Sequence, residues 1–416
     1  MGKCSQSGMG GETRQREGLL VSKSIQDLFN DAVKHVEADQ YDEAIKSLEP
    51  IIQLYPLMVS ALVQRGRCHW EMHRWDKSMN DFDLSLRLDP ESADAKWTVG
   101  LMTLQLGDFK RGWELYDARW DSNAFKSPKL KTKLPRWEPE KGYRKVLVWC
   151  EQGIGDQVIY GSFLNALSEQ VDKVTVMIDI RLIRLFQRTM PHIEFVRHDA
   201  RIKNSEYDSQ IAIGSLGQAF IKEQRDIELY RSVRYLKADK NYADQIRQQL
   251  GLTDDDFVIG LSWGSTAPRV GEHKSATLKE LEPLFDLPNA KVVSLQYGKP
   301  KEEIEAFEKE TGKKILQSNV NTFFDLEGIA ATIECCNVVV GCSNANVHIA
   351  GAMNVPTYVL DANKLWYWNH KDGNTSLFYP LLKLFTRDHI LAPWDKQIQE
   401  LISEVSRYQQ LLEEFK

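Results

Sequence analysis

The 416-residue sequence predicts an all-helical repeat region followed by two α/β lobes. Three observations predict this fold class: a 34-residue repeat near the N-terminus, an alternation of strands and helices in the middle of the chain, and a second such alternation after it. Alternating strands and helices form parallel sheets that are covered on both faces. We therefore expect an α + α/β chain with its helical part first.

Composition excludes several classes of function. Apolar residues make up 42% and charged residues 27%, which is ordinary for a globular protein. A net charge of −6 argues against general nucleic-acid binding, which needs a basic surface. No apolar run approaches the roughly 18 residues of a membrane span, and the polar N-terminus has no signal-peptide core. Six cysteines without a CxxC pair favour a cytoplasmic protein without a structural zinc site.

The repeat consists of columns of similar residues at intervals of 34 positions. One column is aromatic, one is small, one is large, and two more contain proline and glycine. Stacked helical hairpins need such columns, because each hairpin buries its apolar face only against the next. The columns are Tyr41, Trp75 and Phe109; Ala44, Ser78 and Gly112; Leu48, Phe82 and Tyr116; Pro56 and Pro90; and Gly66 and Gly100.

This pattern resembles the tetratricopeptide repeat. About three repeats cover residues 25–126, after a disordered tail at 1–24. The stack either offers a concave surface to a partner protein or forms a rigid cap on the following domain. Trp113, Tyr116 and Trp120 follow helical spacing, and we expect them to form a seam with the next domain rather than a ligand site.

Four segments follow the repeats. Residues 127–143 are rich in proline and lysine and are expected to be a linker. The alternation then predicts an N-terminal Rossmann-like lobe at 144–240, a C-terminal Rossmann-like lobe at 241–395 and a helix at 396–416. Ligands of such sheets bind at the carboxyl ends of the strands, so the cleft between the lobes is the expected site.

The individual elements are expected from apolar runs and helical spacing. Strands are expected at 145–149, 174–178, 193–196, 210–213, 257–262, 291–295, 337–341 and 357–360, and helices at 158–170, 181–190, 242–250, 278–284, 302–311, 326–335 and from 348.

The loop after the first strand contains Gly153, Gly155 and Asp156. The glycines permit a tight turn and let a ligand approach the backbone. The loop is not a dinucleotide-binding GxGxxG motif, since Val158 occupies the third glycine position. Asp156 is either a catalytic acid–base group or the N-cap of the next helix.

Two further loops follow buried strands. The second loop of the candidate site contains Trp263, Gly264 and Ser265 with Lys274 beyond it, a combination that suits a diphosphate or is an ordinary surface loop. The third loop leads into a helix whose first turn has small polar residues, where an anion can reach unpaired N–H groups. His348 is either a ligand or loop-positioning residue or a buried structural histidine. The candidates in this third loop are Ser343, Asn344, Asn346, His348 and Gly351.

Motifs in the two lobes resemble those of the heptosyltransferase-like glycosyltransferases of family 9, and more narrowly of members preceded by tetratricopeptide repeats. The resemblance spans residue 25 to about 400. It is carried, in order, by Trp137, the segment 146–156, the segment 260–264, Ser294-Leu-Gln296 and His348-Ile-Ala-Gly-Ala352.

The resemblance implies a GT-B fold and transfer of a sugar from a nucleotide-sugar, with inversion and without an essential metal or other cofactor. The family's catalytic base falls on Asp156 and its phosphate-binding cation on Lys274. Its donor-binding groups fall on Gly153, Gly155, Gln296 and the second and third loops. Ser343-Asn344 stand where the family usually has Asp-Thr, which leaves the donor sugar undetermined and a loss of activity open.

We therefore expect an inverting, metal-independent glycosyltransferase whose acceptor is a hydroxyl of a glycan or a protein. Two alternatives stay open. One is a non-catalytic repeat scaffold with a vestigial transferase domain, and the other is a peptide-directed protein O-glycosyltransferase. The expected partners are a nucleotide-sugar, the acceptor and a protein bound to the repeats.

Overall fold

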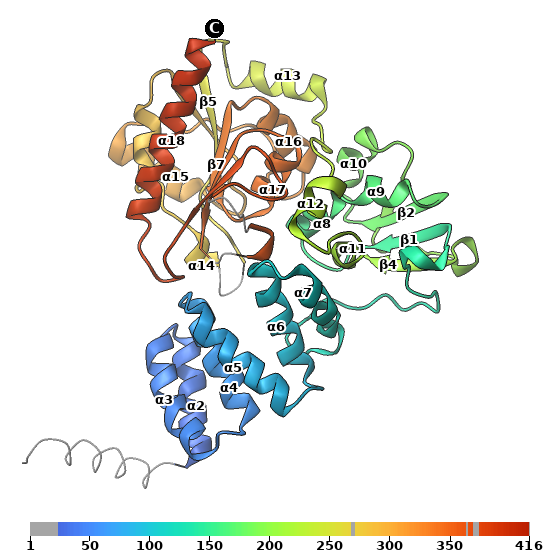
Figure 1. Ribbon diagram of the computed structural model, residues 1–416. Helices are drawn as coiled ribbons and strands as arrows, with labels where there is room; N and C mark the ends of the chain where they lie inside the picture. Colours follow the sequence, from blue (N-terminus) through green and yellow to red (C-terminus); the bar gives the residue numbers. More distant parts are fainter. Residues whose placement is uncertain (1–23, 268–270, 363–364, 369–373, 416) are drawn as a thin grey trace, which may run out of the picture. The chain divides into compact units, whose positions relative to one another are not determined.

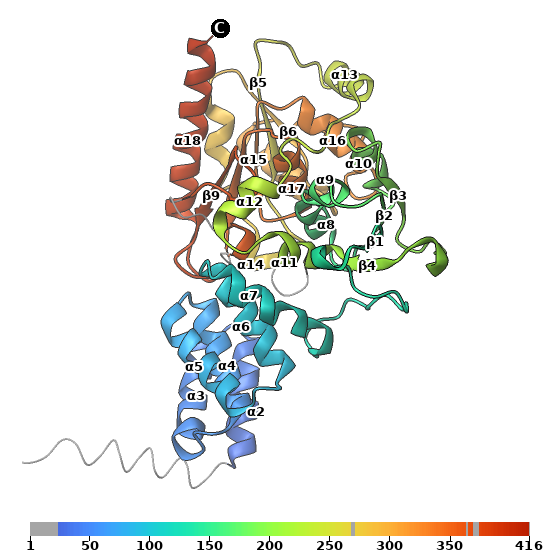
Figure 2. The same ribbon diagram turned by 45° about the vertical axis from the view of Figure 1, so that its right-hand side comes forward.

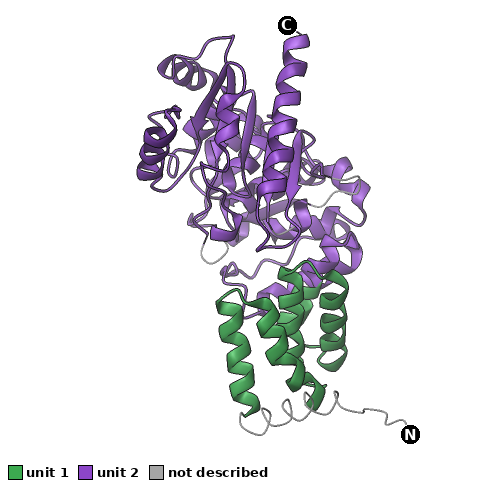
Figure 3. Cartoon of the chain, turned by 90° about the vertical axis from the view of Figure 1, so that its left-hand side faces the viewer, with its two compact units in different colours: residues 1–99 green, residues 100–416 purple. Residues whose placement is uncertain are grey.

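The computed structural model describes residues 24–267, 271–362, 365–368 and 374–415. The predicted disordered tail at 1–24 lies outside these residues except for Ser24. The chain divides into two compact units, residues 1–99 and residues 100–416 (Figure 3). Helix α6 (Ala93–Gln105) contains the boundary, so the predicted repeat segment 25–126 contributes residues to both units. The domain limits proposed from the sequence stay predictions.

The first unit consists of helical hairpins, which confirms the predicted helical part of the fold (Figure 1). Ser24 caps the first helix in a reciprocal capping box with Asp27. The recurring small residues lie where two helices of a hairpin cross, since the Ser78 hydroxyl donates to the Gly66 carbonyl at 2.7 Å. The helices are α2 (Ile25–Glu37), α3 (Tyr41–Leu54), α4 (Val59–Glu71), α5 (Trp75–Leu88) and the start of α6.

The second unit begins with the end of α6 and with α7 (Phe109–Tyr116), which form the third hairpin of the repeat pattern. Its crossing is tight: a Cβ on Gly112 would lie 2.6 Å from Cγ of Leu104. A short 3-10 helix, η1 (Asp117–Asp121), follows α7. The predicted linker then packs on the first sheet, where Trp137 donates its backbone N–H to the Gln210 carbonyl.

The N-terminal lobe has a four-stranded parallel sheet in the order β3-β2-β1-β4. Buried Val146 and Val148 alternate with Leu147 and Trp149, so both faces of β1 are covered. Its strands are β1 (Lys145–Trp149), β2 (Lys173–Ile178), β3 (Glu194–Arg197) and β4 (Ser209–Ala212), and its helices are α8 (Ile154–Gly161), α9 (Leu164–Ser168), α10 (Ile183–Thr189), α11 (Leu216–Phe220) and α12 (Gln224–Tyr230).

The C-terminal lobe has a five-stranded parallel sheet in the order β6-β5-β7-β8-β9. Apolar clusters cover both of its faces, one under α15 and α18 and one under α13 and α16. Its strands are β5 (Phe257–Ser262), β6 (Ala290–Ser294), β7 (Val338–Cys342), β8 (Thr357–Asp361) and β9 (Leu382–Thr386), and its helices are α13 (Lys240–Gln249), α14 (Gly271–Lys274), α15 (Lys301–Thr311), α16 (Leu326–Glu334), α17 (Ala345–Ala352) and α18 (Asp395–Glu414).

The predicted fold class is confirmed, and some elements differ from the expectation. Residues 278–284 form no α-helix; Pro283 lies instead in a 3-10 turn, η5 (Glu282–Asp286), because proline cannot donate the helical hydrogen bond. The helix expected at 158–170 is two shorter helices, α8 and α9. Helix α17 begins at Ala345, three residues before His348. Strand β9 was not predicted.

Packing between α7 and α11 supplies a test of this fold. A Cβ added at Gly217 would lie 2.2 Å from Cζ2 of Trp113, whose indole is buried. We expect Gly217→Ala to lower the free energy of unfolding by about 1–3 kcal/mol, since overpacking forces buried side chains away from their rotamers. Thermal unfolding measures it, with Trp113→Phe as the matched background. If Gly217→Ala lowers the free energy of unfolding by the same amount in the Trp113→Phe background, Gly217 does not pack against the Trp113 ring.

Candidate functional site

Loops from the two lobes meet at the carboxyl ends of β1 and β7. Helix α8 follows β1, helix α17 follows β7, and the two helices contact each other (Figures 1 and 2). The contact is close, because a Cβ on Gly155 would lie 2.8 Å from Cδ2 of His348. The glycine loop and the His348 helix, predicted separately from the sequence, therefore pack against each other.

Asp156 lies in the first turn of α8 and is partly buried. The N-cap of α8 is Gly153, so the alternative in which Asp156 is the N-cap is wrong. Burial, and next the nearby Glu151 carboxylate, raise the pKa of Asp156 to about 6, against the opposing effects of the Gly153 N–H and the Lys274 charge. A carboxyl group with this pKa can accept and release a proton near neutral pH.

Lys274 ends the short helix α14 and is half-buried. Its positive charge acts on Asp156 in one lobe and on Cys342 and His348 in the other. Among the residues that the structure describes, no carboxylate lies within 4.0 Å of its ammonium group. The ammonium group is therefore available to an anion bound between the loops.

The side chains predicted for the second loop bind other parts of the protein. The Gln296 amide closes a pair of hydrogen bonds on Gly264: its Oε1 accepts from the Gly264 N–H at 2.8 Å, and its Nε2 donates to the Gly264 carbonyl at 3.2 Å. Trp263 donates its indole N–H to Glu303 at 2.9 Å. The backbone N–H of Ser265 donates to the Ser275 hydroxyl. These contacts engage both side chains and backbone groups of the loop, and they fix its conformation.

The polar side chains of the third loop have the same role. Asn344 is the N-cap of α17, where its Oδ1 accepts from the Asn346 N–H, and its amide donates to the Ser262 hydroxyl at 2.8 Å. The Asn346 amide donates to the Leu295 carbonyl at 2.6 Å. The Ser343 hydroxyl accepts from the Trp368 indole N–H at 3.0 Å. The second and third loops are thus tied to each other by buried amides.

His348 is enclosed by aromatic rings. Its Nδ1 lies 3.1 Å from the Tyr379 hydroxyl, and its ring stacks on Trp368 at 4.7 Å. Burial lowers the pKa of His348 to about 3, so the imidazole is neutral at physiological pH. Gly351 packs on the same tyrosine, since a Cβ there would lie 2.6 Å from the ring. These contacts favour the structural and positioning alternatives for His348 over a direct ligand role.

The three predicted seam aromatics pack against the lobes that follow them. Trp113 meets Trp366 edge-to-face at 5.1 Å, and Trp120 lies 5.2 Å from Trp149. The Tyr116 hydroxyl lies 3.5 Å from that of Tyr160. The predicted seam is therefore present within the second unit.

Sequence reasoning missed two charged residues beside the site. Arg119 is fully buried and donates to Glu151 at 3.3 Å, and the Glu151 side chain is also fully buried. Burial raises the pKa of Glu151, while Arg119 opposes that shift. The available signal was an arginine between Tyr116 and Trp120 in an otherwise apolar helix face, but its partner lies 32 residues away in the sequence.

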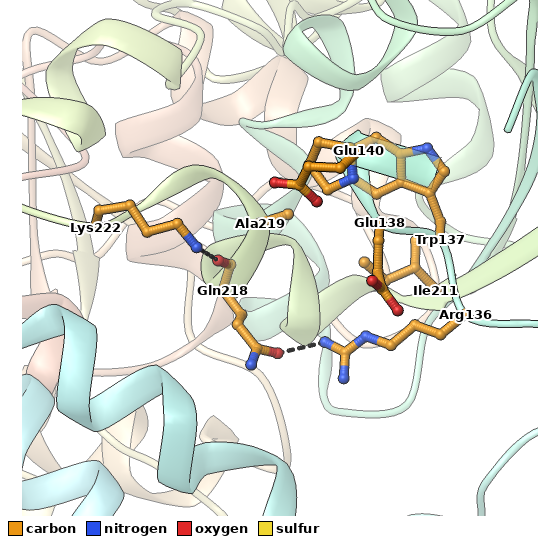
Figure 4. Close-up of a pocket in the computed structure, with 9 residues that line it drawn as sticks. Arg136, Trp137, Glu138, Glu140, Ile211, Gln218, Ala219 and Lys222 are labelled. Atoms are coloured by element: carbon orange, nitrogen blue, oxygen red, sulfur yellow. Dashed lines mark hydrogen bonds between the residues drawn. The ribbon is translucent and has the colours of Figure 1, made fainter. Parts of the chain in front are cut away.

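A separate pocket of about 270 Å³ lies on the N-terminal lobe and contains none of the predicted site residues (Figure 4). Arg136 at its edge donates to Gln218, and Lys222 donates to the Gln218 carbonyl, so both cations are already engaged (Figure 4). Among the described residues no group of three or more His, Cys, Asp or Glu could hold a metal ion. Likewise, no described helix has the length and apolar character needed to cross a membrane.

No protein-family profile matches the chain. It is 25% identical over 345 residues to protein FlbA of Caulobacter vibrioides; the match covers 76% of this chain and 56% of FlbA, so the chain spans little more than half of that relative.

Two solved structures are similar to part of the chain. One is the glycosyl transferase family 9 protein of Veillonella parvula, with 14% identity, 65% of this chain, 99% of that chain and a TM-score of 0.47. The other is the ADP-heptose LPS heptosyltransferase II of E. coli, with 14% identity, 64% and 99% coverage and a TM-score of 0.45.

The raised pKa of Asp156 predicts how stability responds to its removal. The folded state holds this proton more tightly than the unfolded state, so the ionised carboxylate destabilises the fold above pH 6, and acidification from pH 6 toward 4 relieves that effect. We expect Asp156→Asn to raise the free energy of unfolding at pH 7 by about 2–3 kcal/mol, from roughly 1.4 kcal/mol per pKa unit.

Thermal unfolding at pH 7 and pH 5 measures this effect. The matched control is Asp179→Asn at the end of β2, where the Arg181 side chain lowers the pKa of the carboxyl, so the substitution should destabilise. A lower melting temperature for Asp156→Asn at pH 7 would mean that Asp156 supports helix α8 instead.

Proposed function

We propose that the chain is an inverting, metal-independent glycosyltransferase of the cytoplasm. It moves a sugar from a nucleotide-sugar to a hydroxyl group of a glycan or protein. The observation that carries the proposal is that a partly buried acid, Asp156, lies after the carboxyl end of β1 in one lobe and is acted on by the charge of Lys274 in the other, for which no described carboxylate lies within 4.0 Å. Such strand ends are where α/β folds bind nucleotides.

The roles of the two residues follow from their charges. Asp156 accepts the proton of the acceptor hydroxyl while that oxygen forms a bond to the anomeric carbon. The bond from that carbon to the diphosphate breaks in the same step, and the configuration inverts. Lys274 and N–H groups of the loop before α17 stabilise the negative charge on the departing nucleoside diphosphate. The step needs neither a covalent enzyme intermediate nor a metal.

The electrostatics favour this proposal over the vestigial scaffold. A partly buried carboxylate with a raised pKa reduces stability when it is ionised, and such groups are concentrated at functional sites. Ser343 and Asn344, which stand in place of the family's Asp-Thr, leave the loop ordered, because Asn344 caps α17 and donates a hydrogen bond to Ser262. Both observations support a binding-competent site. A protein partner on the helical repeats is part of the proposal.

The test is release of nucleoside diphosphate from a panel of nucleotide-sugars, first with water and then with glycan and Ser/Thr-peptide acceptors. The proposal requires one donor to be consumed and the product to have the opposite anomeric configuration. A chain that binds donors without ever transferring the sugar would instead be a scaffold.

With that donor, we expect Asp156→Asn to lower turnover by about 10²–10⁴-fold, the usual loss when a general base is removed. The asparagine keeps the shape and lacks the proton acceptor, so donor affinity should stay near that of the wild type. Wild-type activity should also fall as the pH drops through about 6, where Asp156 becomes protonated. Normal turnover by Asp156→Asn would place the base elsewhere.

Lys274→Ala should weaken donor binding by about 10–100-fold, since a charge-assisted contact contributes about 1.5–3 kcal/mol. Calorimetry with the donor measures the change. The matched control is Lys279→Ala, because Lys279 lies five residues away and forms ion pairs with Glu282 and Glu310. Equal donor affinity in the two variants would remove Lys274 from the phosphate site.

A further inference from the structure

Arg119 is a fully buried cation at the junction between the last repeat helix and the first lobe. It lies in η1, directly after α7. Its guanidinium donates to Asp117 at 2.6 Å, to the Ser215 hydroxyl at 2.7 Å and to Glu151 at 3.3 Å. It also lies over the Tyr116 ring at 4.3 Å. A buried charge held by this many groups fixes its surroundings.

Glu151 is the buried carboxylate among these partners, and it lies two residues after the end of β1. Its side chain has no exposed surface, and its Oε2 lies 3.5 Å from the Gly214 N–H. A Cβ on Gly214 would lie 2.6 Å from Oε1, so the loop after β4 closes over the carboxylate. Glu151 therefore cannot reach a substrate, and any role in transfer must act through a neighbour.

The neighbour is Asp156, which lies at the other end of the same short loop. The loop is fastened along its length: Gln152 donates to the Tyr116 hydroxyl at 3.2 Å, and Gln157 donates to the Gln152 carbonyl at 2.9 Å. Consequently α7 and η1 hold the loop at Gln152 and Glu151, and Asp156 follows on the first turn of α8. The spacing between the two carboxylates is set by this frame.

We propose that Arg119 and Glu151 form a positioning pair for Asp156, in which the buried guanidinium holds the Glu151 carboxylate as a fixed anion beside the β1–α8 loop and this anion tunes Asp156 as a proton acceptor. The proposal rests on the proposed function and deepens it. It makes the segment that follows the last repeat helix part of the transfer machinery, since Arg119 is supplied by that segment.

Other charged and titratable groups also face Asp156. Lys274 opposes the effect of Glu151, and it is unchanged in the variants below. Four tyrosine hydroxyls also interact with the Asp156 charge. Burial raises the pKa of each well above neutral, so they stay protonated while Asp156 titrates; they are Tyr116, Tyr160, Tyr367 and Tyr379. Glu151 is the carboxylate whose charge raises the pKa of Asp156.

The test is the titration of Asp156 in the full-length chain, followed by NMR of ¹³C-labelled aspartate carboxyl groups and assigned by the loss of one signal in Asp156→Asn. The Glu151→Gln substitution removes the charge and keeps the acceptor for Arg119. We expect the Asp156 midpoint to fall by about one pH unit, in the range that a nearby like charge produces. The acid limb of kcat/KM should move by the same amount.

Asp117→Asn is the matched control, because Asp117 is the other carboxylate on the same guanidinium. It should leave the Asp156 midpoint unchanged. If Glu151→Gln does not fold, a double variant, Arg119→Met with Glu151→Met, takes its place. It replaces both charges with apolar side chains of similar volume, and we expect the same downward shift of the Asp156 midpoint. An unchanged or higher midpoint, or an equal shift in Asp117→Asn, overturns the proposal.

The two claims fail separately. The NMR titration needs no substrate, so it decides the positioning role even when no nucleotide-sugar is consumed. Conversely, if the wild type consumes a donor but Glu151→Gln leaves the Asp156 midpoint unchanged, the proposed transferase activity is supported and the positioning role of Arg119 and Glu151 is rejected.

Discussion

The contact between Gly155 and His348 is the constraint on which the site depends. Any side chain at Gly155 would enter the space of the His348 ring, so helix α8 can lie against α17 only with a glycine there. His348 is in turn held by Tyr379 and Trp368, which fix the position of its ring against helix α8. The carboxyl ends of β1 and β7 are thereby brought together, with Asp156 on one side and the loop before α17 on the other.

Electrostatics give this arrangement its chemical character. Burial and the Glu151 carboxylate raise the pKa of Asp156, and the Lys274 charge opposes them. The loops around these groups are satisfied by hydrogen bonds of their own, through Gln296, Asn344 and Asn346. A site whose frame is internally satisfied and whose two opposite charges are not paired with each other is prepared for an acceptor proton and an anionic leaving group.

Much of this fold follows from local sequence. Continuous apolar runs such as Val338–Cys342 identify buried parallel strands, and 34-residue columns identify the helical hairpins. Strand β9 was missed because its apolar residues are interrupted by Lys383 and the strand lies at the end of the five-stranded order. Residues 278–284 fit a helical pattern, but Pro283 confines them to a 3-10 turn.

The candidate site was predictable in its location and less so in its roles. Glycines and polar residues after buried strands located the loops, because parallel strands end at one edge. Their side chains proved to be structural, since hydrogen bonds such as Asn344 to Ser262 join residues 82 positions apart. The ion pair between Arg119 and Glu151 could not be predicted for the same reason. Which charged side chains are buried together depends on tertiary packing, and residue spacing in the sequence does not indicate it.

The central claim is that the loops between the two lobes bind a nucleotide-sugar. The most direct measurement is thermal unfolding of the full chain with a panel of nucleotide-sugars and the corresponding nucleoside diphosphates. We expect at least one nucleotide-sugar to raise the melting temperature in a concentration-dependent way, since a ligand that binds only the folded state stabilises it. The matching nucleoside diphosphate should have a smaller effect. If none of the nucleotide-sugars shifts the transition at millimolar concentration, these loops are not a donor site.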